Sequence, residues 1–244
     1  MFESVEQVEF EDPGVLARAV FALTDDELEA LTGAAAEAYV LAAQRAINAL
    51  TARQYAAIEQ VAARCDEEVE IACAEAETLG ARLPRVGGAE IATASLAPLL
   101  HISPRTMAHR VRRARQVVCE LPRIHDLALA GDLEPYRVEA IAREAEGAPA
   151  SRVHEFEARL LATDITHLTG SALRRRARRC AEQSSDDLED VAARGRARRS
   201  VRLIPSRVAG LTTLIADLPT PTAVRLFGAI DALGSEYLRA QPGT

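Results

Sequence analysis

Apolar residues recur at helical spacing along most of the chain, which predicts a mostly α fold in the form of a helical bundle. From Ala34 to about Leu79 hardly any helix breaker occurs, so we expect a long helix or an antiparallel helical pair. The apolar positions near helical spacing in this stretch are Tyr39, Ala43, Ala46, Leu50, Ile58, Val61, Val69 and Ile71. Such an element is expected to serve as a scaffold or dimer interface, or to be buried against later helices.

The stretch from Ser95 to Gln116 has the spacing of a helix-turn-helix, two short helices joined by a tight turn. Ser103 stands at an N-cap position, and Pro104 at the first helical position, where its missing N–H costs nothing. On a helix from Pro104 to Val118, one stripe contains Met107, Val111, Ala114 and Val118, and the opposite stripe contains Arg105, His109, Arg112 and Gln116. One stripe can pack while the other meets a partner.

The turn before this helix departs from the usual pattern. His101 stands where glycine or asparagine is common, because those residues adopt left-handed backbone geometry easily. Histidine tolerates that geometry better than a β-branched residue does.

The second helix carries a run of arginines without one acid, which favours contact with DNA over a merely solvated face. Arg105, His109, Arg112 and Thr106 are expected to face bases. The expected phosphate contacts are Arg110, Arg113 and Arg115.

A second arginine cluster lies in a helix that begins between Thr169 and Ser171. Five arginines in six positions cannot all share one face, so some are expected to serve the fold or a second phosphate-contacting surface. The cluster consists of Arg174, Arg175, Arg176, Arg178 and Arg179, of which Arg174, Arg175 and Arg178 are predicted DNA contacts.

The remaining pattern predicts further short elements. Residues 1–13 are expected to be a loosely ordered acidic lead-in, and Thr24 to Glu27 is a capping-box signature. Other helices are predicted around 16–23, 122–131, from 135 and through 156–161. From Ser200, two short β-branched runs about Gly210 predict a small hairpin over 201–205 and 211–216, followed by a helix over 222–238.

Charge divides the 244-residue chain more sharply than its net charge of −7 suggests. Residues 1–80 hold 17 Asp and Glu against four Arg, and the remainder holds 19 against 25. We therefore predict an acidic long-helix region at 1–80, a basic helical region at 81–199 with the helix-turn-helix at about 91–118, and a hairpin with a helix at 200–244. Basic residues favour phosphate contacts, although the two regions could also balance each other within one fold.

The sequence shows no converging nucleophile and base, no metal-ligand set and no phosphate loop. We therefore predict no catalytic residue and no metal-ligating residue in this chain. The four cysteines show no close pairing and are expected to be reduced thiols. No apolar run is long enough for a membrane span, and the acidic N-terminus argues against a secretory signal. We therefore expect a cytoplasmic protein without a membrane partner.

The order of several segments resembles the 13E12 repeat family, also catalogued as domain of unknown function 222. These segments are ARLP from Ala81, LAPLLHISPRTMAHRVRRARQV, ELPRIHDLALAGDLEPYRVEAIA, LRRRARR and VRLIPSRVAGLTTLIADLPTPTAVRLFGAIDAL. Members commonly continue into a C-terminal HNH endonuclease domain with a metal-dependent site. The resemblance implies that this chain is the non-catalytic DNA-binding part of a truncated or split copy, that a separate HNH nuclease domain is a partner, and that a divalent metal cofactor would belong to that domain.

The stretch from Leu96 to Ile141 also resembles the helix-turn-helix region of the chromosome-partitioning ParB type. The matching residues are Ser103, Thr106, Leu121, Pro122, Gly131 and Leu133. This similarity supports the fold alone. We therefore expect double-stranded DNA as the partner. The alternative is a helical protein–protein interaction module, such as a homodimer, in which the arginines pair with the chain's own acids.

Overall fold

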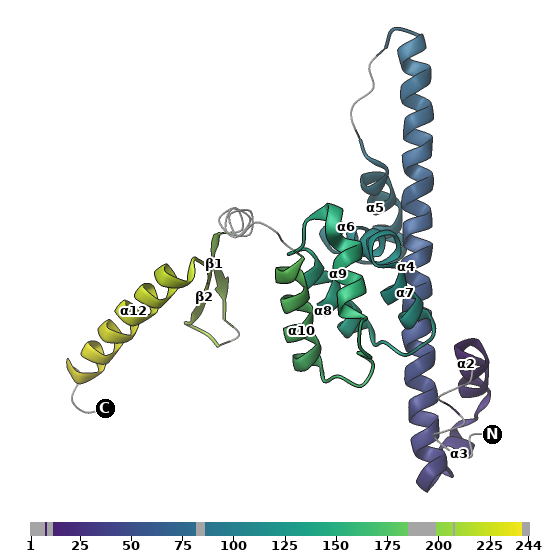
Figure 1. The fold of residues 1–244 in the computed structure, drawn as a ribbon, viewed down its shortest axis with the longest axis horizontal. Helices are drawn as coiled ribbons and strands as arrows, with labels where there is room; N and C mark the ends of the chain where they lie inside the picture. Colours follow the sequence, from purple (N-terminus) through teal and green to yellow (C-terminus); the bar gives the residue numbers. More distant parts are fainter. Residues whose placement is uncertain (1–7, 9–11, 82–85, 185–198, 207, 241–244) are drawn as a thin grey trace. The chain divides into compact units, whose positions relative to one another are not determined.

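The computed structural model describes Val8 and residues 12–81, 86–184, 199–206 and 208–240. These residues are mostly helical and include one two-stranded hairpin, as the sequence pattern predicts (Figure 1). It divides into two compact units, Met1–Ser184 and Ser185–Thr244.

The first unit is organised around one continuous 46-residue helix, α4, from Gly33 to Thr78. The predicted long element is therefore a single helix and not an antiparallel pair. The other described elements of this unit are α2 (Pro13–Ala22), α3 (Asp25–Glu29), α5 (Gly88–Leu99), α6 (Pro104–Arg115), η1 (Gln116–Glu120), α7 (Pro122–Leu129), α8 (Pro135–Ala145), η2 (Ala150–Arg152), α9 (Val153–Leu160) and α10 (Gly170–Gln183). The predicted capping box forms at α3, where Thr24 and Glu27 bond reciprocally. Most of the predicted acidic lead-in lies outside the described residues, apart from Val8, which is buried, and residues 12 and 13.

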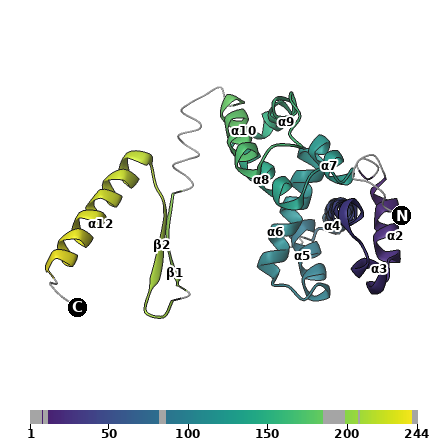
Figure 2. The same cartoon turned by 90° about the horizontal axis from the view of Figure 1, so that it is seen from below.

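Alanines let neighbouring helices approach α4 closely, and α2, α5, α6 and α7 all contact it (Figure 2). Ala38 and Ala42 pack with Leu16 of α2. Further along α4, Ile58 and Ala62 meet α5 and α6 in a second core. That core contains Ile58, Ala62, Ala92, Ala97, Met107, Val111 and Ala114.

The largest core lies among α7, α8, α9 and α10 and includes Phe156, Leu121 and Ile141. Tyr55 of α4 packs against both this core and the α5–α6 core. The acidic region predicted at 1–80 and the basic helices to residue 184 therefore share one unit, because α4 packs directly against α5, α6 and α7.

The apolar positions predicted along α4 do not form one buried stripe. Ala46 and Ile58 are buried, whereas Leu50 and Ile71 are exposed. The buried side of α4 instead follows a different row at three- and four-residue spacing, which includes Ala38, Ala42, Arg45, Ala49, Ala52, Glu59 and Ala62.

The second unit contains the predicted hairpin and helix. Strands β1 (Ser200–Pro205) and β2 (Thr212–Asp217) pair antiparallel, with Leu203 opposite Leu214. Gly210 has φ +83°, which explains the glycine in the connecting turn. Helix α12 (Thr220–Ala240) begins two residues before the predicted start.

Candidate nucleic-acid interface

A tight turn joins α5 to α6, as the spacing predicts. His101 has φ +52°, and it is the only described residue other than glycine with a positive φ. The N–H of Ile102 donates to the carbonyl of Ala97 at 3.1 Å and that of His101 to Pro98 at 3.2 Å, which is the Schellman pattern of a helix end. This left-handed residue turns the chain toward the start of α6.

The first turn of α6 is capped as predicted. The Ser103 hydroxyl accepts from the backbone N–H of Thr106 at 3.1 Å, and Pro104 occupies the first turn. The hydroxyls of Ser103 and Thr106 lie 2.8 Å apart. The orientation of this end of the helix is therefore specified by its own residues.

The two stripes of α6 largely separate as predicted. Met107, Val111 and Ala114 are buried. The exposed residues Arg105, Thr106, His109 and Arg112 form what we call the α6 polar face, and Arg110 beside it is half-buried.

The sequence pattern places Gln116 on that face, but the residue is buried. The helix continues past Arg115 as a π-helical turn, η1, in which the N–H of Leu121 donates to the carbonyl of Gln116 at 3.1 Å. This wider turn changes the rotation per residue, so Val117 instead of Val118 enters the core. Gln116 turns inward and donates to the carbonyl of Ala142 at 2.9 Å.

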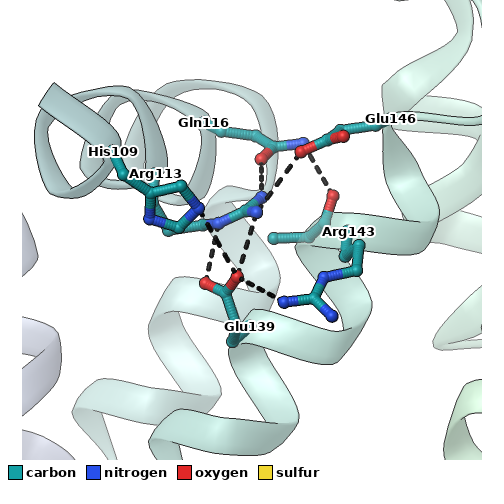
Figure 3. Close-up of polar contacts among 7 residues, drawn as sticks. His109, Arg113, Gln116, Glu139, Arg143 and Glu146 are labelled. Atoms are coloured by element: carbon teal, nitrogen blue, oxygen red, sulfur yellow. Dashed lines mark hydrogen bonds and ion pairs between the residues drawn. The ribbon is translucent and has the colours of Figure 1, made fainter. Parts of the chain in front are cut away.

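Arg113, a predicted phosphate contact, is also buried, and only 5% of its surface is exposed. Its Nε lies 2.8 Å from Glu139 Oε2, and its Nη2 lies 3.3 Å from Glu146 Oε1 (Figure 3). It also donates to the Gln116 side chain. Glu139 in α8 and Glu146 at its C-terminal end neutralise the buried guanidinium. Arg113 therefore joins α6 to α8 and is not available to a phosphate.

Arg115, the other predicted phosphate contact near the end of α6, is held by α4. Its Nη2 lies 2.6 Å from Asp66 Oδ2, and its Nε lies 3.2 Å from Glu59 Oε1. Burial lowers the pKa of Arg115, but hydrogen bonds and charge from the two acids outweigh it and raise the pKa above its usual value. Asp66 Oδ1 also accepts from the N–H of Gly88 at 2.8 Å, so one carboxylate ties the start of α5 and the end of α6 to α4.

An acid also stands beside the α6 polar face. His109 Nε2 lies 3.9 Å from Glu139 Oε1, and Glu139 is also the residue that neutralises Arg113 (Figure 3). The His109 side chain is about half exposed. It is therefore accessible to a ligand while it faces one negative group.

The α10 arginines lie on a different helix from the α6 polar face, one that packs against α8 and α9. Arg174 and Arg175 are exposed. Arg178 is paired with Glu144, with 3.3 Å between Nε and Oε2. Arg176 donates to the carbonyls of Leu160 and Arg159 at the end of α9 and so stabilises the packing of α10 on α9. This structural role agrees with the expectation that the five arginines cannot all share one face.

Sequence reasoning missed the acids that partner these arginines. Glu59, Asp66, Glu139, Glu144 and Glu146 each face an arginine from another helix. No local spacing identifies such pairs, because the two partners of a pair lie 26 to 56 residues apart in the chain. The sequence pattern indicates these acids only through the alternative hypothesis, the protein–protein interaction module, in which the arginines pair with acids of the same chain.

No protein-family model, curated protein or solved structure matches this chain. Within the described residues, no three His, Cys, Asp or Glu side chains gather as a metal site. The same residues contain no helix with the length and apolar character of a membrane span.

Proposed function

We propose that this chain is a DNA-binding module that places its α6 polar face in the major groove. The observation that carries the proposal is the exposure of Arg105 and Arg112 on a capped helix that follows a tight turn. In the described part of the chain, neither guanidinium has an acidic partner. Unpaired arginines on a helix that fits the major groove can read base edges and phosphates.

The ion-paired arginines refine the set of DNA contacts. Arg105, Thr106, His109 and Arg112 face the bases in this proposal, and Arg110 reaches a phosphate. Arg113 and Arg115 instead hold α6 against α8 and α4, so they orient the polar face without touching DNA. Positioning by ion pairs to neighbouring helices suits a reader helix, because its contacts depend on a fixed orientation.

The resemblance to the 13E12 repeat family supports the same proposal. On this basis the chain supplies DNA binding in the cytoplasm, and an HNH domain on a separate partner or in a longer gene product supplies cleavage. The divalent metal then belongs to that HNH domain and not to this chain.

The test is equilibrium binding of the full chain to a pool of labelled duplexes, followed by fluorescence anisotropy. Arg105→Ala/Arg112→Ala should weaken binding by about tenfold or more, since each arginine contact contributes about 1–3 kcal/mol. Arg18→Ala/Arg53→Ala is the matched control, because it removes two exposed arginines from α2 and α4. Equal binding by all three proteins would refute the proposal.

A homodimer through α4 is the second candidate function. Val40, Ile47 and Leu50 are 68%, 53% and 50% exposed, and their spacings of seven and three residues place them on one side of α4. Sedimentation velocity over a range of concentrations tests this candidate. It predicts a dimer that Ile47→Glu dissociates and that Ile71→Glu, at an exposed site farther along α4, leaves intact. A monomer at every concentration would exclude it.

A further inference from the structure

A pocket of about 590 Å³ lies between α10 and the end of α9 with the loop that follows it. Its polar lining consists of Arg159, Thr163, Arg175, Arg176, Arg179 and Gln183. Four arginines and no acid line the pocket, so it presents a concentrated positive charge to any ligand that enters.

Two of these arginines are already engaged. Arg176 donates to the carbonyls of Leu160 and Arg159, and Arg159 lies 2.6 Å from Glu155. Both interactions fix the pocket wall in place.

Arg175 and Arg179 are available to bind a ligand. Both are exposed, and among the described residues neither has a hydrogen-bond or acidic partner. They stand four residues apart on α10, where two like charges repel each other. On α10, Glu182 lines a neighbouring groove, and on α8, Glu144 is paired with Arg178. A bound anion would relieve the repulsion between Arg175 and Arg179.

The apolar part of the pocket lining consists of Ala162, Leu168, Ala172 and Cys180. An inorganic anion would leave these side chains uncovered, whereas an organic anion with a ring could cover them. The volume lies within the range of small-molecule sites. Thr163 and Gln183 can form hydrogen bonds with the polar part of such a ligand.

We propose that this pocket binds a nucleotide, with the phosphates on Arg175 and Arg179 and the base against the apolar part of the lining. A duplex backbone would contact exposed arginines along α10 without covering these apolar side chains. The site uses no residue of the α6 polar face, so it stands independently of the proposed DNA-binding function.

The test is isothermal titration calorimetry of the full chain with ADP, adenosine and pyrophosphate in metal-free buffer. We expect ADP to bind at one site, pyrophosphate to bind more weakly and adenosine not to bind. Arg175→Gln/Arg179→Gln should weaken ADP binding by about tenfold or more, because it removes two charge-assisted hydrogen-bond donors from the phosphates. Arg174→Gln/Arg178→Gln removes the same charge from the same helix outside this pocket and should change the affinity by less than about threefold.

The proposal would be overturned by no ADP binding, by pyrophosphate binding as tight as ADP binding, or by equal weakening of ADP binding in the two double variants. Thermal melts of both variants establish that each is folded. Duplex binding by the same variants tests whether these arginines contact DNA instead. If Arg175→Gln/Arg179→Gln weakens duplex binding but leaves ADP binding unchanged, these arginines serve DNA and the nucleotide site is refuted.

Discussion

Arg113 in α6 and Glu139 in α8 form a buried ion pair, with 2.8 Å between Nε and Oε2. The side chain of Arg113 is only 6% exposed, so the charge of Arg113 depends on its carboxylate partners. Among the described ion pairs that join α6 to α8 and its C-terminal end, this pair has the shortest distance.

Glu139→Ala should lower the free energy of unfolding by about 3 kcal/mol, because it leaves a buried guanidinium with less compensation. Urea denaturation measures this decrease. Arg143→Ala is the control, since Arg143 contacts the same carboxylate from an exposed position and should cost less than about 1 kcal/mol. Similar decreases in both variants would show that the buried pair does not stabilise the fold.

Gly88 should not tolerate a side chain. A Cβ at Gly88 would overlap the backbone nitrogen and carboxylate of Asp66, whereas a Cβ at Gly87 meets nothing within 4 Å. We expect Gly88→Ala to destabilise the protein by about 1–3 kcal/mol, and Gly87→Ala to cost less than about 1 kcal/mol. Thermal melts compare the two, and equal stability would contradict the close approach of α5 to α4.

His101 tests the left-handed turn between α5 and α6. At φ +52°, a β-branched residue is strained by about 1–2 kcal/mol, so His101→Val should be less stable than His101→Gly by about that amount. Leu99→Gly is the control, because glycine in ordinary helical backbone at this exposed position should lower stability by about 1 kcal/mol. Denaturant melts rank the variants. A valine variant as stable as the glycine variant would contradict the turn geometry.

Glu157 should make stability depend on pH. It is 2% exposed and its Oε1 accepts from the N–H of Ile124 at 3.0 Å, and burial raises the pKa of its carboxyl above the usual value. The folded state therefore binds this proton more tightly than the unfolded state does. The contribution of Glu157 to stability is largest at low pH and falls as the pH rises from the ordinary pKa through the raised one.

Glu157→Gln removes this titration while keeping an acceptor oxygen. The stability of the variant minus that of the natural chain should therefore increase with pH across that window and level off above it. Denaturant titrations at a series of pH values give this difference. A difference that decreases with rising pH would contradict a raised pKa at Glu157.

The elements that could be predicted from the sequence are those whose causes are local. The cap at Ser103, the proline at position 104 and the buried positions Met107 and Val111 all follow from neighbours within a few turns. The hairpin about Gly210 is predictable for the same reason, since the turn residue and the flanking β-branched runs lie together in the sequence.

Features that depend on distant partners are not predictable in this way. Arg113 has an arginine's usual preference for the surface, and its burial depends on Glu139 and Glu146, contributed by α8 and its C-terminal end, and on the Gln116 side chain. The π-helical turn at Gln116 has no local signature, yet it moves Gln116 from the predicted exposed face into the interior. The candidate site is consequently smaller than the arginine run suggests.

The salt dependence of duplex binding tests the proposed DNA-binding face most directly. If the α6 polar face contacts DNA, the affinity of the natural chain should fall steeply with rising salt. Arg105→Ala/Arg112→Ala should then bind more weakly, and Arg110→Ala, which removes the proposed phosphate contact, should have a salt slope smaller by about one unit. Arg18→Ala/Arg53→Ala should retain the natural affinity and slope. An unchanged affinity in Arg105→Ala/Arg112→Ala together with an unchanged slope in Arg110→Ala would contradict the proposal that this helix face binds DNA.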